Sequence, residues 1–547
     1  MRKTFVAFAF AFALCNIAQA QEKHNDILVG QEAMIDIIRE LNIGYVDSVD
    51  NKALYTTAIN AMLASLDPYT VYIPAERDDY LRQLTTGDMG GGIGATLRQE
   101  GDYILIVEEM EGLPVHKAGL LAGDLITEVD GKSIKGKPVA DVTKLLRGTP
   151  GTEVEITVRR ATTTKPIKAK LIRENITRPA ISFAGMIDES TALIKVDEFT
   201  ESVSESFKNH LATLAATGKM KQLIVDLRYN VGGNVGEAVD MLSLFLPKHT
   251  KVLTMKMKDG NGTRTYATTL TPIYADLPLA VLVNEGTASA AEIFAGAIQD
   301  LDRGIILGTR TFGKGLVQNI KALNYDGNLK MTVAKYYTPS GRCIQAIDYA
   351  NKSENRNKPI PDSLTHTFKT TNGRIVRDGR GITPDSTLTE EEGTYIAYNL
   401  YTKNIMFDYA VRYHRMHPSI AEPTKFALSD ADYDDFINFV KSKNFTYELE
   451  SARGIKYLEE QIAYDGYSEQ TQALIEQLKQ ILQPDIQKDL QQFKSSILEY
   501  LEGEIVTKYY YNKGYNAYVE SHDKWVKTAI NILSDPNQLN QILSPKK

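Results

Sequence analysis

The sequence contains little cysteine: its 547 residues include two, Cys15 and Cys343. Two cysteines form at most one bridge, so the chain is not a disulfide-stapled scaffold, and loss of Cys15 on export would leave no internal disulfide. Long apolar runs are also missing. No stretch beyond the first 20 residues approaches the roughly 18 unbroken apolar residues of a membrane-spanning helix. We therefore expect no transmembrane segment in the mature chain, and stability that comes from packed cores.

Positive charge is in deficit as well. The chain has 62 Lys and Arg against 69 Asp and Glu, a formal net charge of −7. A dedicated nucleic-acid binder normally shows a basic field, so we expect no nucleic-acid partner. The remaining composition, 43% hydrophobic and 24% charged, is typical of a soluble globular chain, and the length predicts roughly three or four domains.

Residues 1–20 have the features of a cleaved export signal. Arg2 and Lys3 precede an apolar run, and the small residues of Ala18-Gln19-Ala20 end it. A basic start, a short apolar stretch and an A-x-A ending are the signature of such a signal. We expect cleavage after Ala20 and an exported, periplasmic protein, whose association with a membrane would need a partner.

The rest of the chain divides into four regions by its apolar periodicity. Residues 21–87 and 391–547 show helical spacing, residues 88–175 contain short β-like runs, and residues 176–390 alternate strands with helices. This pattern predicts a multidomain α+β protein whose α/β core gathers ligands at the carboxyl ends of its strands. The predicted elements are strands over 103–107, 154–158, 223–227 and 279–283, and helices over 139–146, 236–245 and 290–299.

Four motifs in the β-rich region, at 90–95, 118–120, 123–124 and 129–132, contain glycine or small residues at turns. Together they resemble a PDZ domain, although a lone glycine run would indicate only a β-turn. A glycine-rich loop can turn backbone N–H groups toward a peptide's terminal carboxylate, while a strand edge accepts the peptide. By this resemblance the carboxylate loop consists of Ile93, Gly94 and Ala95, and Val142 and Leu146 face the peptide groove.

Two predicted strand ends carry residues suited to catalysis. The first runs into Gly232 and Gly233, and paired glycines allow backbone amides to approach a ligand closely. At the second, Ser289 lies where the chain passes through a turn into a helix, whose N-terminal amides can stabilise an oxyanion. Taken alone, a serine at such a corner is more typical of a helix N-cap.

The segment that follows this helix nearly matches a phosphate-binding loop. Gly308, Gly313 and Lys314 have the required spacing, but Gly315 stands where a Ser or Thr should reach Mg²⁺, and a strand pattern follows. We therefore expect no ATP site here and no cofactor.

Histidine, the usual base of a serine hydrolase, is absent from this window. None of the eight histidines lies between His249 and His366. Lys314 offers an alternative, because removing water from an ammonium group favours the neutral amine. Phe312, Leu316 and Val317 are the apolar neighbours expected to bury it.

Ser289 in Thr287-Ala288-Ser289-Ala290, Lys314 in Thr311-Phe312-Gly313-Lys314-Gly315, Gln318 and the preceding PDZ-like region are similar to the C-terminal processing peptidases, the tail-specific serine proteases. The resemblance spans about residues 60–390. It implies a core of the ClpP/crotonase-like fold with Ser289 as nucleophile, Lys314 as general base and Gln318 as the residue that orients the lysine. It also implies a backbone oxyanion hole from Ala290 and either Gly232 or Gly233. The sequence departs from the family pattern at Ala291, Arg380 and Cys343, none of which belongs to the Ser/Lys pair.

We therefore expect an exported serine endopeptidase that captures exposed C-terminal tails of proteins through its PDZ domain and cleaves them through an acyl-enzyme. Arg147 is expected to contact the core when the PDZ domain moves, a regulatory role. The alternative is a non-catalytic PDZ scaffold, against which the intact Ser289, Lys314 and Gln318 set argues.

The C-terminal helical region has no chemistry that the sequence identifies. We expect the helical regions to bind an adaptor or to mediate self-association. His414 and His417 are predicted to be a surface pair, because zinc would need further ligands. The tyrosines at 509–511 fit a packing patch, and a site for a glycan or a partner protein stays open.

Overall fold

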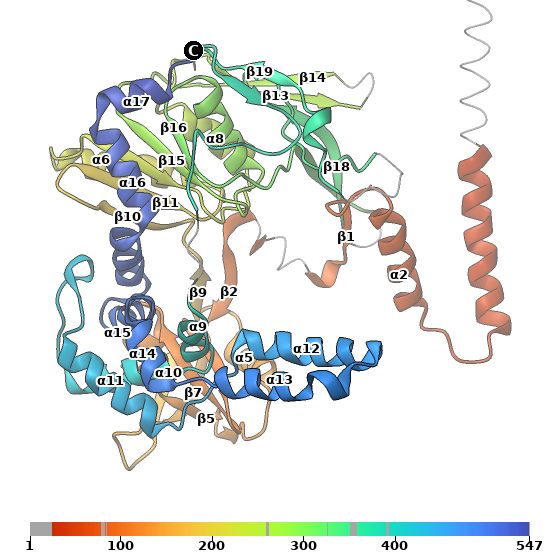
Figure 1. Ribbon diagram of the computed structural model, residues 1–547. Helices are drawn as coiled ribbons and strands as arrows, with labels where there is room; N and C mark the ends of the chain where they lie inside the picture. Colours follow the sequence, from red (N-terminus) through yellow and green to blue (C-terminus); the bar gives the residue numbers. More distant parts are fainter. Residues whose placement is uncertain are drawn as a thin grey trace, which may run out of the picture. The chain divides into compact units, whose positions relative to one another are not determined.

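The structure, a computed structural model, describes residues 25–77, 82–83, 85–258, 262–324, 327–350, 358–389 and 393–545. The predicted export signal lies outside these residues. The chain forms two compact units, one of residues 1–73 with 320–331 and one of residues 74–319 with 332–547 (Figure 1). The two units are described separately below.

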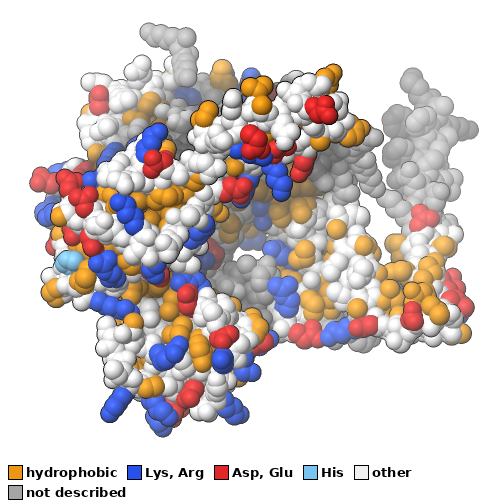
Figure 2. All heavy atoms as spheres, turned by 60° about the horizontal axis from the view of Figure 1, so that its bottom comes forward, with side chains coloured by type: hydrophobic (Ala, Val, Ile, Leu, Met, Phe, Trp, Pro, Cys, Tyr) orange, Lys and Arg blue, Asp and Glu red, His pale blue; other side chains and the backbone are white. Residues whose placement is uncertain are grey.

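The smaller unit contains two N-terminal helices, one over residues 25–44 and α2, Asn51–Ala64. The first of these helices leaves apolar side chains exposed on its surface (Figure 2). The predicted helical region does not continue to residue 87, because Pro68 cannot extend a helix and Asp67 accepts the amides of Tyr69 and Thr70 in a turn. The chain then forms the short strand β1, Val71–Ile73, which pairs with residues 328–330.

A six-stranded antiparallel sheet with two short helices forms the PDZ domain. Its strand order is β3-β4-β5-β7-β8, with β6 paired to β5, so β3 is an edge strand. Buried aliphatic side chains of the sheet and the helices fill one core. The elements are β3 Ala95–Glu100, β4 Tyr103–Glu109, α4 Pro114–Lys117, β5 Leu125–Val129, β6 Lys132–Ser133, α5 Val139–Leu146, β7 Glu153–Arg159 and β8 Ile167–Ile172. A two-stranded ladder of β2, Asp88–Gly92, with β9, Glu174–Thr177, connects the domain to the core.

The predicted α/β core is built on a six-stranded sheet of order β10-β11-β12-β15-β16-β21. β10 is antiparallel to β11, and the other strands run parallel. The central strands β12 and β15 are buried along their whole length, which is characteristic of parallel strands covered on both faces. The strands are β10 Ile181–Met186, β11 Thr191–Val196, β12 Gln222–Asp226, β15 Leu279–Val283, β16 Ile305–Gly308 and β21 Ser386–Thr387.

Helices cover both faces of this sheet (Figure 1). On one face, α6 Val203–Ala216, α7 Val235–Leu242 and α8 Ala290–Asp300 pack into the largest hydrophobic core. On the other face lies α16, Lys524–Ser534, whose Trp525, Val526 and Ala529 contact the strands. The end of the C-terminal region is therefore a layer of the α/β core, which differs from the predicted boundary between the two at residue 390.

A second sheet flanks the core. β17, Leu316–Ala322, pairs with β18, Asn328–Tyr337, and β18 continues to β13, Lys251–Met257, and β14, Thr263–Ala267. The hairpin β19 Thr367–Lys369 and β20 Ile375–Arg377 follows. β17 begins two residues after Lys314, and this strand was predicted in place of the helix that a phosphate-binding loop would need.

The C-terminal region is helical, as predicted, and has its own aromatic-rich core. Tyr509 and Tyr510 donate their hydroxyl hydrogens to backbone carbonyls of the same region, which confirms their packing role. His414 and His417 pack on tyrosine rings. The helices are α9 Tyr395–Thr402, α10 Ile405–Met416, α11 Asp430–Ser442, α12 Glu450–Asp465, α13 Ser468–Ile481, α14 Ile486–Gln492, α15 Lys494–His522, α16 and α17 Pro536–Ile542. Within the described residues, none of the helices has the length and apolarity needed to span a bilayer.

Candidate active site

Two neighbouring parallel strands, β12 and β15, deliver the candidate catalytic segments to the same edge of the sheet. Their paired residues include Asp226 with Leu282, so the turns that follow both strands begin side by side. Hydrogen bonds connect the turns directly: Thr287 Oγ1 donates to the carbonyl of Leu227 at 2.8 Å. The two candidate segments therefore meet at the carboxyl ends of the strands, where the sequence predicts that ligands bind.

The turn after β12 is organised by Asn230, which is fully buried. Its side-chain amide donates to the carbonyl of Val196 at 2.7 Å, and its Oδ1 accepts the amide of Gly232 at 2.8 Å. Its backbone carbonyl accepts the amide of Ala288, the residue before Ser289. One residue thus fixes the glycine turn and attaches it to the segment that carries the serine.

Ser289 is the N-cap of α8 and is half-buried. Its φ angle is +56°, a conformation that non-glycine residues adopt rarely and that is often found at functional sites. Its backbone carbonyl accepts a hydrogen bond from the hydroxyl of Tyr336, a buried residue of β18. The serine therefore sits at a constrained corner between strand and helix, as the sequence predicted.

Glu292 connects the serine segment to the lysine segment. Its side chain is fully buried and accepts four hydrogen bonds. The amide of Ser289 donates to Oε2 at 3.0 Å, and the amide of Lys314 donates to the same oxygen at 2.8 Å. Oε1 accepts the amide of Gly313 at 2.8 Å and the hydroxyl of Thr311 at 2.5 Å.

This carboxylate organises the candidate site and is not among the residues that the sequence predicted for it. The local signal was present, because Ser289-x-x-Glu292 has the spacing of a capping box. Nothing local indicated that the same carboxylate would bind the loop around Lys314. Burial raises the pKa of Glu292, and the hydrogen bonds from Thr311 and from the amides oppose that rise.

Lys314 is half-buried in the loop between β16 and β17. Of its predicted apolar neighbours, Leu316 is buried and Val317 packs against the main core. Phe312 differs from the expectation: half of its surface is exposed, so it points toward solvent instead of sealing the lysine. Gln318 donates its side-chain amide to Thr332 of β18 at 3.1 Å, and its role as the residue that orients Lys314 stays a prediction.

Gly232 lies directly against the N-terminus of α8. A Cβ atom placed on it would be 2.7 Å from the Cβ of Ser289 and 2.8 Å from the amide nitrogen of Ala290. The amide of Ala290, the first residue of α8, has no acceptor within the helix, as is general for helix N-termini. The amide of Gly232 is used by Asn230, whereas Gly233 is exposed and its amide meets no acceptor among the described residues.

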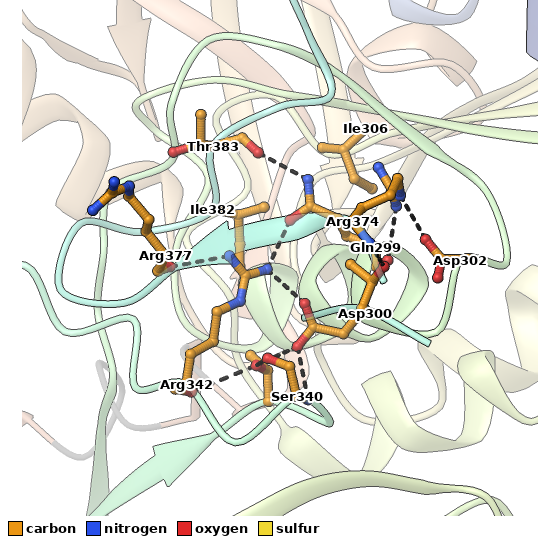
Figure 3. A network of polar contacts seen from close by, with 12 residues as sticks. Gln299, Asp300, Asp302, Ile306, Ser340, Arg342, Arg374, Arg377, Ile382 and Thr383 are labelled. Carbon is orange, nitrogen blue, oxygen red and sulfur yellow. Dashed lines mark hydrogen bonds and ion pairs between the residues drawn. The ribbon is translucent and has the colours of Figure 1, made fainter. Parts of the chain in front are cut away.

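The far end of α8 is held by a buried polar network (Figure 3). Arg342 donates to Asp300 Oδ1 at 2.8 Å and to Gln299 Oε1 at 2.7 Å. The segment that carries Arg342 continues to Gln345, whose Oε1 accepts the amide of Gly315 at 2.7 Å. The segment from Arg342 to Gln345 therefore makes a second connection, between the C-terminal end of α8 and the loop that carries Lys314.

The structure brings the predicted PDZ residues into one domain. Ile93 is buried, and Gly94, with a φ angle of +72°, packs against Leu113 at the start of α4. Ala95 opens the edge strand β3. Val142 and Leu146 lie on α5 in the hydrophobic core of the domain, and their contribution to a peptide groove stays a prediction.

Arg147 and Cys343 are two further residues that the sequence singled out. Arg147 is exposed at the C-terminal end of α5, where its side chain forms no hydrogen bond or ion pair with any described residue. Its predicted regulatory contact is untested. Cys343 is half-buried, and burial raises the pKa of its thiol, as expected for a packing residue.

Comparison with protein families finds matches along most of this architecture. The model of Peptidase family S41 matches residues 190–351, a PDZ domain model matches residues 105–160, and the model of a probable PDZ-protease C-terminal helical domain matches residues 396–533.

Two relatives matched by sequence give the same picture. A carboxy-terminal-processing protease of Bartonella bacilliformis is 36% identical over 57% of this chain and 72% of its own length. A probable CtpA-like serine protease of Staphylococcus aureus is 34% identical over 56% of this chain and 61% of its own length. Among solved structures, a photosystem II D1 C-terminal processing protease is 27% identical, with a TM-score of 0.35, over 65% of this chain and 87% of its own.

Proposed function

Because the chain belongs to the carboxy-terminal-processing proteases and is a serine-type C-terminal processing peptidase with a PDZ domain, we propose that Ser289 and Lys314 form its catalytic dyad. The observation that supports this assignment is the shared carboxylate of Glu292, which binds the backbone of both residues. Two loops that one buried group holds together can keep a nucleophile and a base in register.

In this proposal the neutral amine of Lys314 takes the proton of Ser289 Oγ as the oxygen attacks the scissile carbonyl carbon. The carbonyl oxygen becomes an oxyanion, and the lysine then passes the proton to the leaving amine as the C–N bond breaks. An acyl-enzyme remains. The lysine next takes a proton from water as the water oxygen attacks the ester, and it returns that proton to Ser289 Oγ as the ester bond breaks and the new C-terminus is released. Gln318 is assigned to orient the lysine.

The oxyanion is assigned to two backbone amides. Ala290 supplies the first donor at the N-terminus of α8, where the helix dipole favours negative charge. Gly233 supplies the second, because the amide of Gly232 already donates to Asn230 while that of Gly233 meets no acceptor among the described residues. Gly232 serves by close approach, since it has no side chain to displace Ser289.

The PDZ domain is assigned to capture the substrate tail. Edge strand β3 can accept an extended peptide by strand addition, with the terminal carboxylate at the amides of Ile93, Gly94 and Ala95. Holding the tail raises the effective concentration of the scissile segment at the dyad. We further infer from the first 20 residues that the enzyme is exported and acts on proteins of the periplasm.

The deciding experiment measures cleavage of a protein substrate with a free C-terminal tail by Ser289→Ala and Lys314→Ala. Each variant should lose at least about 1,000-fold in kcat, as removal of a nucleophile or its base does. Ser202→Ala is the matched control, because Ser202 is also an N-cap with positive φ, at the start of α6, and lies outside the dyad. Full activity of Ser289→Ala would support the scaffold alternative instead.

A further inference from the structure

A buried charge cluster lies beneath the turn that carries Gly232 and Gly233. Arg228 is at its centre. The Nε and Nη2 atoms of its guanidinium reach the carboxylate of Asp226, with a shortest distance of 2.7 Å. Nη2 also donates to Glu520 at 3.1 Å, and Nη1 donates to Asp523 at 2.5 Å. Two of the three acids therefore come from the C-terminal region, about 290 residues away in sequence.

These acids are built into the cluster. The side chain of Glu520 is fully buried near the end of α15, where it also pairs with Lys195 of β11 at 2.6 Å. Asp523 is the N-cap of α16 and accepts the amide of Trp525 at 2.6 Å. The guanidinium of Arg228 lies over the ring of Trp525, 5.5 Å from its centroid. The start of α16 thus contributes one carboxylate, that of Asp523, and one aromatic ring, that of Trp525, to the contacts of Arg228.

The five residues after Arg228 connect it to the candidate active site. Tyr229 has a φ angle of +62° and donates its amide to Asn284, so the chain turns sharply directly after the arginine. Asn230 then holds the amide of Gly232 and accepts the amide of Ala288. A displaced Arg228 would move both the glycine turn and the residue that precedes Ser289.

We propose that Glu520 and Asp523 are positioning residues for the peptidase reaction, which hold Arg228 so that the turn to Gly233 stands beside Ser289. This inference rests on the proposed function of that serine. The last turn of α15 and the start of α16 therefore complete the active site from outside the matched protease region, which ends at residue 351. This gives the C-terminal helices a role in the chemical step.

The test compares full-length wild type with Glu520→Gln and Asp523→Asn on a tail-bearing peptide. Loosening an oxyanion turn should lower kcat by roughly 10- to 100-fold, while KM changes by less than about threefold because the PDZ domain is untouched. Ser534→Ala is the matched control: Ser534 binds Gln222 at the opposite end of β12, so its loss weakens the same interface away from the turn. It should keep wild-type kcat.

A double-mutant cycle separates positioning from general destabilisation. If Glu520 acts through Arg228, then Glu520→Gln combined with Arg228→Gln should lose no more kcat than Arg228→Gln alone, and Arg228→Lys should restore part of the loss. Asp523→Asn, whose side chain is 16% exposed, serves if a Glu520 variant does not fold. Additive losses, or wild-type kcat in folded Glu520→Gln and Asp523→Asn, would overturn this inference alone. Activity of Ser289→Ala would instead overturn the proposed function.

Discussion

The backbone amides of Ser289 and Lys314 donate to one and the same oxygen, Oε2 of Glu292, at 3.0 and 2.8 Å. This contact couples a helix N-terminus to a loop that follows a different strand, and Lys314 lies 22 residues after Glu292 in the chain. Because the carboxylate is buried and its second oxygen is also occupied, neither segment can shift without leaving a buried donor or acceptor unpaired.

Glu292→Gln is therefore expected to impair catalysis without removing either member of the dyad. The glutamine NH₂ group would face backbone amides, so at least two donors lose their acceptor. We expect kcat to fall by roughly 100-fold and the free energy of unfolding by about 2 kcal/mol. Steady-state kinetics and urea unfolding measure the two effects. Glu237→Gln is the control, because Glu237 likewise accepts two amides at a helix start, that of α6.

Gly232→Ala tests the close approach of the glycine turn to the serine. The added Cβ would lie 2.7 Å from the Cβ of Ser289, and the φ angle of +96° disfavours any side chain. We expect kcat to fall by at least about 100-fold with little change in tail binding, measured by fluorescence anisotropy of a tail peptide. Gly454→Ala in α12, where nothing lies within 4 Å, should leave kcat unchanged. Equal kinetics for both variants would contradict the assigned geometry.

Gly94→Ala tests tail capture by the PDZ domain. Its Cβ would lie 2.3 Å from the Cβ of Leu113, so the proposed carboxylate loop must shift. We expect KM for a substrate with a free C-terminus to rise about tenfold, while kcat stays within about twofold.

Gly112→Ala provides the matched control for this prediction. Gly112 has nearly the same φ angle, +75° against +72°, but has no atom within 4 Å of the built Cβ. Both variants therefore share the strain of a left-handed backbone, but only the Cβ of Gly94→Ala collides with a neighbouring side chain, that of Leu113. A substrate with an amidated C-terminus should be insensitive to Gly94→Ala. If KM rises equally for the free and the amidated tail, the loop does not bind the carboxylate.

Much of the core could be predicted from the sequence because its signals are local. β15, Leu279–Val283, coincides with the predicted strand, since buried parallel strands are continuous apolar runs. α8 extends one residue beyond its prediction, to Asp300. The candidate dyad followed from the resemblance of the motifs around Ser289 and Lys314 to those of the C-terminal processing peptidases. The short strand β1 was missed, because three residues after a proline turn carry no periodicity.

The contacts that organise the site could not be predicted, because their partners are remote in sequence. Helical spacing identified the C-terminal helices, but it does not show which surface an amphipathic helix covers. Trp525 packs on the sheet of the core, and Glu520 reaches Arg228 across 292 positions. For the same reason the sequence left the C-terminal region without chemistry. The orientation of Lys314 by Gln318 and the role of Arg147 stay predictions.

The stability of the protein should depend on pH through Glu520. Burial and the charge of Asp226 raise the pKa of Glu520 to about 7 from an ordinary 4.5, against the attraction of Lys195 and Arg228. Asp523 adds a further negative charge beside the arginine, while the cationic neighbours lower the pKa of the buried Asp226. The folded state therefore binds a proton at Glu520 more tightly than the unfolded chain does.

The sign of the effect follows from this difference. Stability contributed by protonated Glu520 is fully present below about pH 4.5 and is lost as the pH rises to about 7, above which the contribution is constant. Urea unfolding at pH 5, 6, 7 and 8 should show the stability of wild type relative to Glu520→Gln falling by up to about 3 kcal/mol toward pH 7 and then levelling. Ser534→Ala should follow the wild-type slope, whereas parallel curves for wild type and Glu520→Gln would contradict the raised pKa. Ionised Glu520 is also the form that binds Arg228 most strongly. The charge state that positions the glycine turn is therefore the one in which the folded protein has the lower free energy of unfolding. Active sites commonly carry such a cost in stability.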